Sequence, residues 1–398
     1  MKFDEYLLQD VIESVIDNRG ITPEKKGGVW SDSGYKVISA KNIKTSRIVN
    51  KDSIRFINEE LYKKWMPNEI RKYDILLTSE APCGEVFLWD SDEKITLGQR
   101  IFGLRCNPDF DPRYIYYYMC SRYFQGDLLN RNSGTTVQGI RQKELLKCKI
   151  LAPSLKDQEK IADILYNIEE KIKINDLINA NLLQQSQLIL KEYYEKYESK
   201  ESNVGELAKV IDCLHSKKPE LQTSGKRFIQ LDNIKDHGML DFSESFWISE
   251  EDYSQWTTRC EVSEGDIVIT NVGRIGAVSQ MPPNEVAAMG RNMTCIRPDK
   301  YPAFLITSLL SSQMRAEIDY NTDSGTIMNA LNVRNIPKLS LYVFDEKIQL
   351  DLESKLFNIR RTMETNLKEI NQLSLLRDYL LPKLMSGEID VSQLDLAD

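Results

Sequence analysis

Several patterns that carry chemistry in other proteins are missing from this chain of 398 residues. Its two histidines, His215 and His237, leave little material for a zinc site or a catalytic triad. It has no glycine-rich loop ending in Gly-Lys-Ser or Gly-Lys-Thr, which is the usual cradle for nucleotide phosphates. It also has no run of 18 apolar residues, so we expect no membrane span.

Cysteine usage argues against a disulfide framework. The seven cysteines are scattered, odd in number and free of Cys-x-x-Cys spacing. This pattern favours reduced, mostly buried thiols. The first residues, Met1–Glu5, lack the basic and apolar regions of a secretory signal. We therefore expect a cytoplasmic protein.

Motifs of methyltransferases and nucleases are not convincing here. The Pro-Pro pair of Met281–Asn284 lacks the flanking acid or amide and the aromatic residue that an amino-methyltransferase carries. Asp92–Lys94 and Asp345–Lys347 have adjacent rather than alternating charged residues, which is typical of solvated turns. We expect no catalytic residue, no metal and no cofactor in this chain.

The charge of the chain is unevenly distributed. A net charge of −8 argues by itself against nucleic acid, because neutralising phosphates requires Lys and Arg. However, Arg19–Lys51 holds eight Lys and Arg against two acids, and Arg131–Lys149 holds five against one. DNA binding through one face is therefore open, and so is the alternative that these are solvated loops without a partner.

The sequence is written twice, with an offset of 191 or 192 positions. Asp74–Thr78 returns as Asp266–Thr270, and a Ser-Gly-Thr run at Ser133 returns at Ser324. Three glycines recur in register, at 84 and 276, 98 and 290, and 134 and 325. Such internal repetition indicates one backbone plan used twice, as in a binder with two recognition modules.

Each module has a mixed α/β pattern. Apolar spacing predicts a helix over Asp4–Ile16 and aromatic-rich helices over Tyr114–Leu129 and Phe304–Ile318. Short strands are predicted at 35–39, 74–78, 85–89 and 101–105. Helices do not alternate regularly with these strands, so a doubly wound parallel sheet is not expected. The repeated Trp65 and Trp256 suit core positions.

A long helix is predicted at the end of each module. Apolar residues spaced alternately by four and three run from Ile161 to Tyr193 and again from Leu352 to Leu384, which predicts coiled-coil helices of roughly 60 Å. Asn175 and Asn366 hold equivalent seam positions. We hypothesise that they meet in an antiparallel pair and set its register. Pro382 should end or kink the second helix, and Gly387 is a stop signal.

Three groups of residues resemble one known family. Each long helix begins with nearby Gln and Ile, in Ala152–Ala162 and Phe344–Gln349, the Ser-Gly-Thr runs occur in both modules, and the chain closes with Leu376–Ile389. In this order and duplicated, the pattern resembles the DNA-specificity (S) subunits of Type I restriction–modification systems. The resemblance covers the whole chain, although Val343-Phe344 replaces the Pro expected before the second helix.

The resemblance implies an α+β protein. Two similar mixed α/β target-recognition domains, 1–153 and 201–344, would be joined by two long antiparallel coiled-coil helices in 154–200 and 345–398, with pseudo-two-fold symmetry. Each domain would read half of a split double-stranded DNA target. The helices would dock two modification subunits that use S-adenosylmethionine. Restriction and translocase subunits, which use ATP and Mg, would complete the assembly.

Loop residues with polar or basic side chains are the candidates for DNA contact. In the first module they are Lys25, Lys26, Lys41, Lys44, Ser79, Gln99, Arg100, Ser133, Thr135 and Gln138. In the second they are Lys217, Lys218, Arg227, Asn233, Asn271, Arg274, Arg291, Asn292, Ser324 and Thr326. The loops differ between modules, since Glu80–Cys83 occupies the place of Val272–Ile275. We therefore expect an asymmetric bipartite target.

Other readings stay open at this point. A protein-interaction scaffold would use the helices without reading DNA, and a recognition module could also serve another type of restriction–modification system. A stand-alone restriction or methylation enzyme would need a catalytic motif that is not found. Salt-dependent DNA affinity would distinguish a DNA reader from a scaffold.

Overall fold

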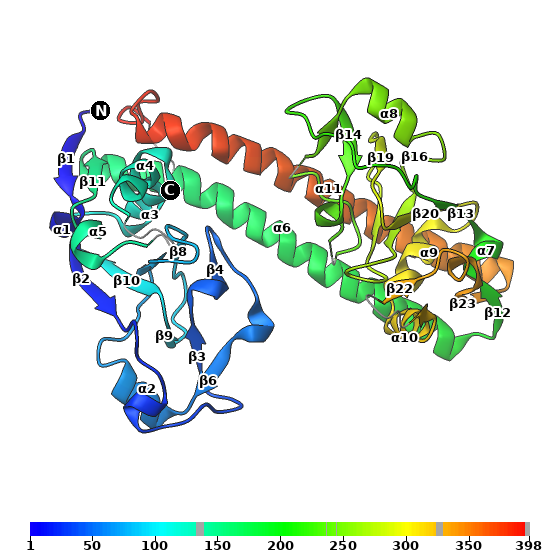
Figure 1. The fold of residues 1–398 in the computed structure, drawn as a ribbon, viewed down its shortest axis with the longest axis horizontal. Helices are drawn as coiled ribbons and strands as arrows, with labels where there is room; N and C mark the ends of the chain where they lie inside the picture. The colour runs from blue at the N-terminus through cyan, green and yellow to red at the C-terminus, as the bar shows by residue number, and fades with distance from the viewer. Residues whose placement is uncertain (133–138, 236, 244, 324–328, 395–398) are drawn as a thin grey trace. The chain divides into compact units, whose positions relative to one another are not determined.

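The computed structural model describes residues 1–132, 139–235, 237–243, 245–323 and 329–394 (Figure 1). The chain forms two compact units. Unit 1 comprises Met1–Glu170 and Leu373–Asp398, and unit 2 comprises Lys171–Gln372. Within the described residues, no helix combines the length and apolarity needed to cross a bilayer.

Unit 1 is built on a four-stranded antiparallel sheet in the order β2-β10-β7-β8. These strands are β2 (Ile12–Asp17), β10 (Ile101–Cys106), β7 (Ile75–Thr78) and β8 (Val86–Leu88). A second sheet, β6-β3-β9, consists of β6 (Arg55–Ile57), β3 (Tyr35–Ile38) and β9 (Ile95–Leu97). Two short pairs complete the unit: β1 (Asp4–Leu7) with β11 (Lys149–Ala152), and β4 (Ile43–Lys44) with β5 (Arg47–Ile48).

Unit 2 repeats this plan. Its main antiparallel sheet has the order β13-β20-β17-β18, with β13 (Ala208–Asp212), β20 (Met293–Pro298), β17 (Ile267–Thr270) and β18 (Val278–Gln280). The second sheet contains β15 (Trp247–Ile248), β14 (Lys226–Ile229), β19 (Ala287–Met289) and an added β16 (Glu261–Val262). The remaining pairs are β12 (Ser199–Asn203) with β23 (Ser340–Phe344) and β21 (Thr322–Asp323) with β22 (Ala330–Leu331).

Strand register confirms the duplication. In unit 1, Leu104 of β10 lies opposite Val15 on one side and Ile75 on the other. In unit 2, Ile296 of β20 lies opposite Val210 and Ile267, which are the repeat counterparts of those residues. The predicted architecture of two similar mixed α/β domains joined by long helices is therefore confirmed, and the sheets are mainly antiparallel.

The helix predicted over Asp4–Ile16 is wrong. This segment forms strand β1, a single helical turn α1 (Leu8–Val11) and strand β2. Its apolar residues fit a helical stripe, but β2 pairs with β10 and Ile12 and Ile16 are buried in it. Helix propensity is a weak preference that such sheet pairing overrides, especially for β-branched residues.

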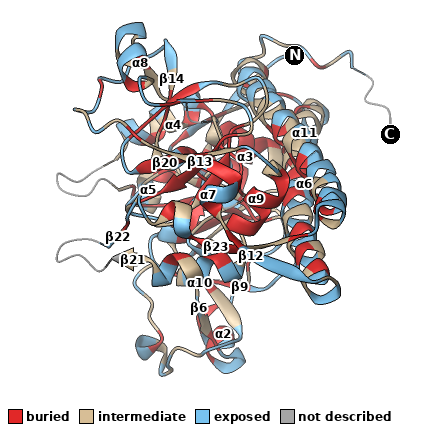
Figure 2. Cartoon of the chain, turned by 90° about the vertical axis from the view of Figure 1, so that its right-hand side faces the viewer, coloured by how far each residue is buried: buried red, intermediate tan, exposed pale blue. Residues whose placement is uncertain are grey.

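Each predicted aromatic-rich helix is a pair of shorter helices. The first pair is α3 (Pro112–Cys120) and α4 (Arg122–Asn130), and the second is α9 (Pro302–Leu309) and α10 (Ser312–Tyr320). Ser311 begins α10 by accepting a hydrogen bond from the N–H of Met314, and Ser121 stands at the equivalent break. The first helix of each pair lies deep in its unit, as the red ribbon of Figure 2 shows.

The predicted core aromatics are buried. Trp65 lies in α2 (Glu59–Trp65) and Trp256 in α8 (Glu250–Trp256), and both are among the largest fully enclosed side chains. Tyr116, Tyr117 and Tyr118 are also buried, so this aromatic run belongs to the core.

The long helices are α6 (Leu155–Lys196) and α11 (Glu346–Met385), drawn green and orange to red in Figure 1. In unit 2 they run antiparallel, because Tyr193 near the end of α6 contacts Asp351 near the start of α11, whereas Asn175 contacts Glu369. Helix α11 continues through Pro382 to Met385, so of the two predicted effects of Pro382, an end or a kink, the end does not occur at this residue. Gly387 follows with a φ of 74°.

The two seam asparagines do not pair with each other. Asn366 donates to the side-chain oxygen of Asn179 at 2.9 Å, and Asn175 donates to Glu369 at 2.8 Å. Asn179 lies one helical turn beyond Asn175. The helices are therefore paired one turn away from the register that would bring Asn175 to Asn366.

Candidate nucleic-acid interface

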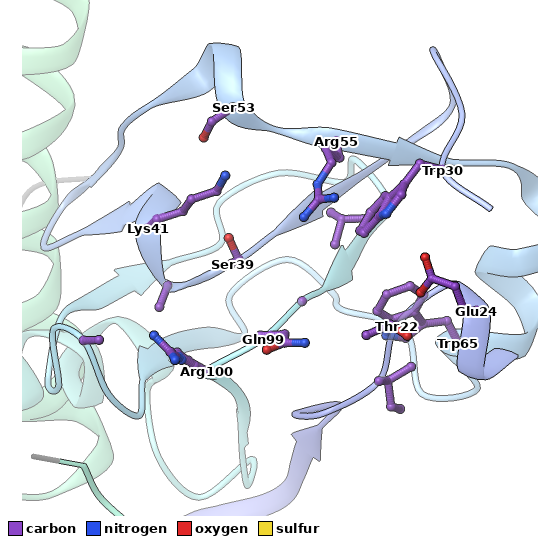
Figure 3. A pocket seen from close by; sticks show the side chains of 15 residues that line it. Thr22, Glu24, Trp30, Ser39, Lys41, Ser53, Arg55, Trp65, Gln99 and Arg100 are labelled. Atoms are coloured by element: carbon purple, nitrogen blue, oxygen red, sulfur yellow. The ribbon is translucent and has the colours of Figure 1, made fainter. Parts of the chain in front are cut away.

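A groove with a volume of about 490 Å³ opens on the second sheet of unit 1 (Figure 3). Its walls come from β3, β6, the segment after β2 and the turn between β9 and β10. Three basic side chains line it, together with two tryptophans and several hydrogen-bonding groups: Lys41, Arg55, Arg100, Trp30, Trp65, Thr22, Ser39, Ser53 and Gln99. Glu24 is the one acid among its lining residues.

A close approach of two backbone segments forms the floor of the groove. The N–H of Gly98 donates to the carbonyl of Ile38 at 2.7 Å, and the N–H of Ala40 donates to the carbonyl of Gln99. A Cβ on Gly98 would lie 3.0 Å from the Ile38 carbonyl oxygen, so a larger residue would push the strands apart. This contact holds Lys41 and Gln99 beside each other.

A buried amide fixes the turn that carries Lys41. Asn42 is fully buried, and its side-chain oxygen accepts hydrogen bonds from the N–H and the hydroxyl of Ser39. Its amide nitrogen donates to the carbonyl of Asn50. The short 3-10 turn of Ala40–Asn42 is thereby held rigid, and Lys41 points away from the core with an exposed side chain.

Two arginines are oriented by neighbours inside the groove. The guanidinium of Arg55 lies 3.9 Å from the ring centroid of Trp30, which is cation–π geometry. Arg100 has a φ of 65°, and its Nε lies 2.9 Å from a carboxylate oxygen of Glu80. Both side chains are exposed and keep donor groups directed to solvent. Hydrogen bonds from the backbone and from Thr22 hold the pKa of Glu24 below its usual range, so this acid is ionised.

This arrangement suits a nucleic acid better than a small neutral ligand. Arginine presents a planar fork that pairs with guanine edges or phosphates, and the amide of glutamine matches adenine. Serine and threonine hydroxyls suit either phosphate or base edges. The three cations exceed the one acid, so the groove has a positive balance.

Unit 2 has the same backbone with different side chains. The N–H of Gly290 donates to the carbonyl of Ile229, and Asn233 caps its turn as Asn42 does in unit 1. Arg291 and Asn292 replace Gln99 and Arg100, and both are exposed. Asp232 takes the place of Lys41 and reverses its charge.

Two further candidates of unit 2 are held by internal contacts. Arg227 is only partly exposed, because Nε pairs with Glu285 at 3.2 Å, Nη1 donates to Ser245, and the guanidinium lies over Phe242. Arg274 is exposed, and its Nη1 donates to the carbonyl of Ile234 at 2.8 Å. This contact helps to position Arg274 at the surface of unit 2.

Three predicted contact residues are buried instead. Ser79 is 2% exposed, and its backbone bonds to Arg100 and Ile140. Asn233 forms the cap described above. Asn271 donates to the carbonyl of Leu331 and accepts from the hydroxyl of Thr294. The side chains of Asn233 and Asn271 satisfy backbone groups that would otherwise be buried without partners, whereas Ser79 is buried where its own backbone pairs.

The remaining candidates fall into two groups. Exposed or partly exposed basic residues form the first group: Lys25, Lys26, Lys217 and Lys218 on short turns and loops, and Lys44 at the end of β4. Residues outside the described part of the chain are Ser133, Thr135, Gln138, Ser324 and Thr326.

Arg55 and Trp30 were missed from the sequence. Arg55 is the first residue of β6 and is exposed, whereas Phe56 is partly buried and Ile57 fully buried. It also lies four residues beyond the basic segment that ends at Lys51. Its charge and its place beside this basic segment would have suggested an exposed arginine, but only the fold places it over Trp30.

Comparison with known proteins agrees with these features. Residues 2–184 match the family model described as Type I restriction modification DNA specificity domain. The specificity subunit of the Type I restriction enzyme MjaIX from Methanocaldococcus jannaschii is 22% identical over 85% of this chain and 83% of its own length. The MjaVIII specificity subunit of the same organism is 27% identical, over 36% of this chain and 35% of its own length.

A solved structure shares the fold of the whole chain. The S subunit of a Type I restriction-modification system from M. genitalium superposes with a TM-score of 0.57, covers 96% of both chains and is 17% identical. At this identity the match concerns the fold.

Proposed function

We propose that this chain, whose residues 2–184 match the Type I restriction modification DNA specificity domain, reads a bipartite DNA sequence. Each unit would recognise one half of the target. The chain would hold no catalytic group itself, so methyl transfer and cleavage fall to partner subunits. Those partners would supply S-adenosylmethionine, ATP and Mg.

The observation that carries the proposal is the groove of unit 1. It gathers Lys41, Arg55 and Arg100 around hydrogen-bonding side chains on a rigid turn. Rigid placement matters because a base-reading side chain must reach one edge in one geometry. Phosphate contacts from Lys25 and Lys44 would orient the duplex without reading its sequence.

The two half-sites should differ. Unit 2 presents Asp232, Arg291 and Asn292 where unit 1 presents Lys41, Gln99 and Arg100. An acid in place of a base changes which base edges are favoured, since a carboxylate accepts from cytosine and lysine donates to guanine. An asymmetric target follows from this exchange.

The long helices are suited to dock protein subunits. Large apolar side chains are exposed along them, with Leu177 at 64%, Leu188 at 59%, Phe357 at 51% and Leu375 at 71%. Exposed apolar residues gathered on one element often mark protein interaction sites. We propose that modification subunits bind there and that restriction subunits join them.

The proposal is tested by mapping methylation. The chain is co-expressed with its modification subunit in a host that lacks DNA methylation, and modified adenines are mapped by long-read sequencing. We expect one bipartite motif with different halves. A palindromic motif would contradict the asymmetry, and no motif at all would contradict the function.

A matched pair of variants adds a second readout. Arg100→Ala should relax the motif in one half, whereas Lys64→Ala on the surface of α2, where Lys64 pairs with Glu60, should leave it intact. If both variants give the wild-type motif, this groove does not read DNA.

A scaffold that binds only proteins is the second candidate, because the exposed apolar residues of the helices fit it as well. It predicts that the assembled complex binds all DNA sequences with the same salt dependence, as expected when only phosphates are contacted. A motif-dependent affinity would exclude it.

A further inference from the structure

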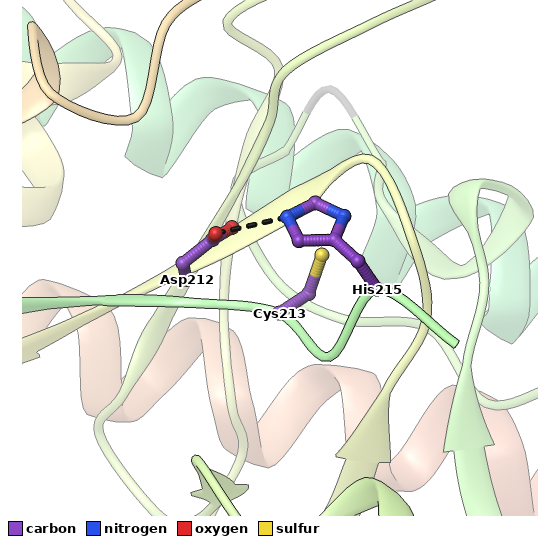
Figure 4. Close-up of side chains that lie close together, drawn as sticks. All are labelled: Asp212, Cys213 and His215. Atoms are coloured by element: carbon purple, nitrogen blue, oxygen red, sulfur yellow. Dashed lines mark hydrogen bonds and ion pairs between the residues drawn. The ribbon is translucent and has the colours of Figure 1, made fainter.

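Three side chains with metal-binding atoms meet where β13 ends in unit 2 (Figure 4). They are Asp212, Cys213 and His215, and their ligand atoms lie within 4.8 Å of one another. Nε2 of His215 lies 2.9 Å from a carboxylate oxygen of Asp212. In Figure 4 the Cys213 sulfur lies beside the imidazole ring, on the side of the Asp212 carboxylate.

The cluster is enclosed on one side and open on the other. Cys213 is 2% exposed, whereas the His215 side chain is 62% exposed. One carboxylate oxygen of Asp212, Oδ1, is buried and has no hydrogen-bond partner among the described residues. A buried carboxylate oxygen without a partner is costly, and a cation would satisfy it.

The donor set matches zinc. Thiolate sulfur, imidazole nitrogen and carboxylate oxygen are its three common protein ligands, and three of them leave a fourth position for water or another ligand. A zinc ion would balance the charges of one thiolate and one carboxylate. Arg259 would act from outside the cluster, since its Nη1 donates to the carbonyl of Cys213 at 2.8 Å and lies 3.5 Å from Asp212.

A second cluster in the same unit lacks these features. Cys260, Asp266 and Cys295 also lie within 4.8 Å, but both oxygens of Asp266 bond to Arg297, at 2.8 and 2.6 Å. Arg297 therefore already supplies the positive charge. Asp74 and Arg105 form the same ion pair in unit 1, where Gly103 replaces Cys295. The Asp–Arg pair is therefore a structural contact that both units share.

We propose that Asp212, Cys213 and His215 bind one zinc ion. The ion would tie the end of β13 to the start of the segment that carries Lys217 and Lys218. The ion would thereby fix the position of both lysines for contact with the DNA of the second half-site, a role that rests on the proposed function. Zinc is bound by the thiolate form of cysteine, so binding must release the Cys213 thiol proton to solvent.

The first experiment measures metal binding directly. The full chain is stripped with a chelator, dialysed against zinc chloride and assayed for bound metal, and cobalt is then substituted to detect the absorption of a thiolate–cobalt bond. We expect one ion per chain and a thiolate band. Metal below a tenth of an equivalent would overturn the site.

Variants assign the ion to this cluster. Cys213→Ser and His215→Ala should each weaken zinc binding at least about tenfold and remove or shift the thiolate band. Cys260→Ser is the matched control and should retain both. Because His215 is exposed, His215→Ala should fold even if Cys213→Ser does not. Full zinc binding in His215→Ala, or loss of zinc in Cys260→Ser alone, would overturn the assignment.

The last step separates the site from the function of the protein. Methylation motifs are compared for wild-type and His215→Ala complexes. If the wild-type complex yields a motif and His215→Ala weakens only one half of it, the coupling to Lys217 and Lys218 is supported. If the motif is unchanged, the coupling is wrong. Absence of any motif in wild type would contradict the proposed function instead, and zinc binding would still stand on its own measurement.

Discussion

In each unit, a charged residue on a long helix forms hydrogen bonds to the α/β domain. The two residues hold the same repeat position but have opposite charges. In unit 1, Glu169 of α6 accepts hydrogen bonds from the hydroxyls of Ser46 and Tyr117. Its counterpart in unit 2 is Arg360 of α11, which donates from Nη2 to the carbonyl of Gly238 and to the side chain of Gln280. The same helix face is an acceptor in one unit and a donor in the other.

Each choice is consistent with its own surroundings. Glu169 also lies 3.9 Å from Arg377, whereas Arg360 is 4% exposed and its Nε and Nη1 have no partner among the described residues. Burial lowers the pKa of Arg360 to about 10. If the two residues were exchanged, an arginine would face Arg377 in unit 1, and a glutamate would face the oxygens of Gly238 and Gln280 in unit 2. The two copies have therefore diverged in their contacts with the long helices as well as in their candidate DNA-contact residues. Each domain consequently fits its own helix segment.

Reversing the charge of Arg360 should have the largest effect. Arg360→Glu places a carboxylate against the oxygens of Gly238 and Gln280, and we expect a loss of about 3–5 kcal/mol of the stability of unit 2. Hydrogen exchange measured separately for the two units tests this. Arg361→Glu is the control, because Arg361 is exposed in the adjacent position and should change stability by less than about 0.5 kcal/mol.

The comparison fails if the two variants have the same effect, or if unit 1 is destabilised as strongly as unit 2. The reciprocal variant, Glu169→Arg, should reverse the pattern and destabilise unit 1, because it faces Arg377 and the hydroxyl of Tyr117.

Removing one of the candidate DNA-contact arginines should affect only one half of the target. Arg55→Ala should lower discrimination at one base position by about 1–3 kcal/mol, and Arg274→Ala should do so in the other half. Competition binding of the assembled complex to single-base variants of its motif measures both. Arg71→Ala, an exposed arginine away from the groove, is the control. Equal weakening on every sequence would mean that these arginines contact phosphates.

The buried helices α3 and α9 are capped by acids from different places in the fold, and the cap of α9 should make the stability of unit 2 depend on pH. Asp111 caps α3 from within unit 1, whereas Glu353 of α11 accepts the N–H groups of Ala303 and Phe304 at the start of α9. Burial raises the pKa of Glu353 above its usual value. The folded state thus binds this proton more tightly than the unfolded chain, so the related stability is present at low pH and is lost as pH rises through the raised pKa.

We expect this dependence to disappear in Glu353→Gln, because the amide has no proton to gain or lose. Urea unfolding of unit 2 between pH 4 and pH 7, conditions chosen around the usual pKa of about 4.3 for glutamate, measures it. Glu346→Gln, at an exposed position of the same helix, should keep the wild-type slope. An unchanged slope in Glu353→Gln would show that other groups cause it.

The smallest effect on stability is expected at the helix pair. Asn366→Leu removes the contact with Asn179 and should change stability by about 1 kcal/mol or less, while the preferred gap between half-sites broadens. Methylation of targets with inserted or deleted spacer base pairs measures the gap. Asn358→Leu, at an exposed position of α11, is the control. If stability rises and the gap preference stays sharp, the asparagine has no role in register.

The repeat, the strands of the main sheets and the long helices could be predicted from patterns along the chain. They depend on local periodicity and on a comparison of the chain with itself. The segment before Asp17 could not be predicted, because the same residues suit a helix until β10 is placed beside them. The division of the chain into four segments stays a prediction, since unit 1 and unit 2 each take part of both long helices.

The candidate site was predicted in part. Lys41, Gln99 and Arg100 were chosen for their residue types and prove to line one groove. Asn233 and Asn271 were chosen for the same reason and are buried, because an amide serves equally well as a base reader and as a partner for backbone groups. Residue type cannot separate these uses, whereas burial does.

By itself, the sequence determined that this protein has two similar α/β modules, two long helices and divergent loops, because repetition and periodicity are properties of the chain. Tertiary structure alone decided which cations share a groove and which turn of α6 Asn366 contacts. It also decided that Glu169 and Arg360, at equivalent helix positions, hold their domains with opposite charges. Those outcomes depend on contacts between residues far apart in the chain, and the energy of each contact depends on burial that no local pattern records.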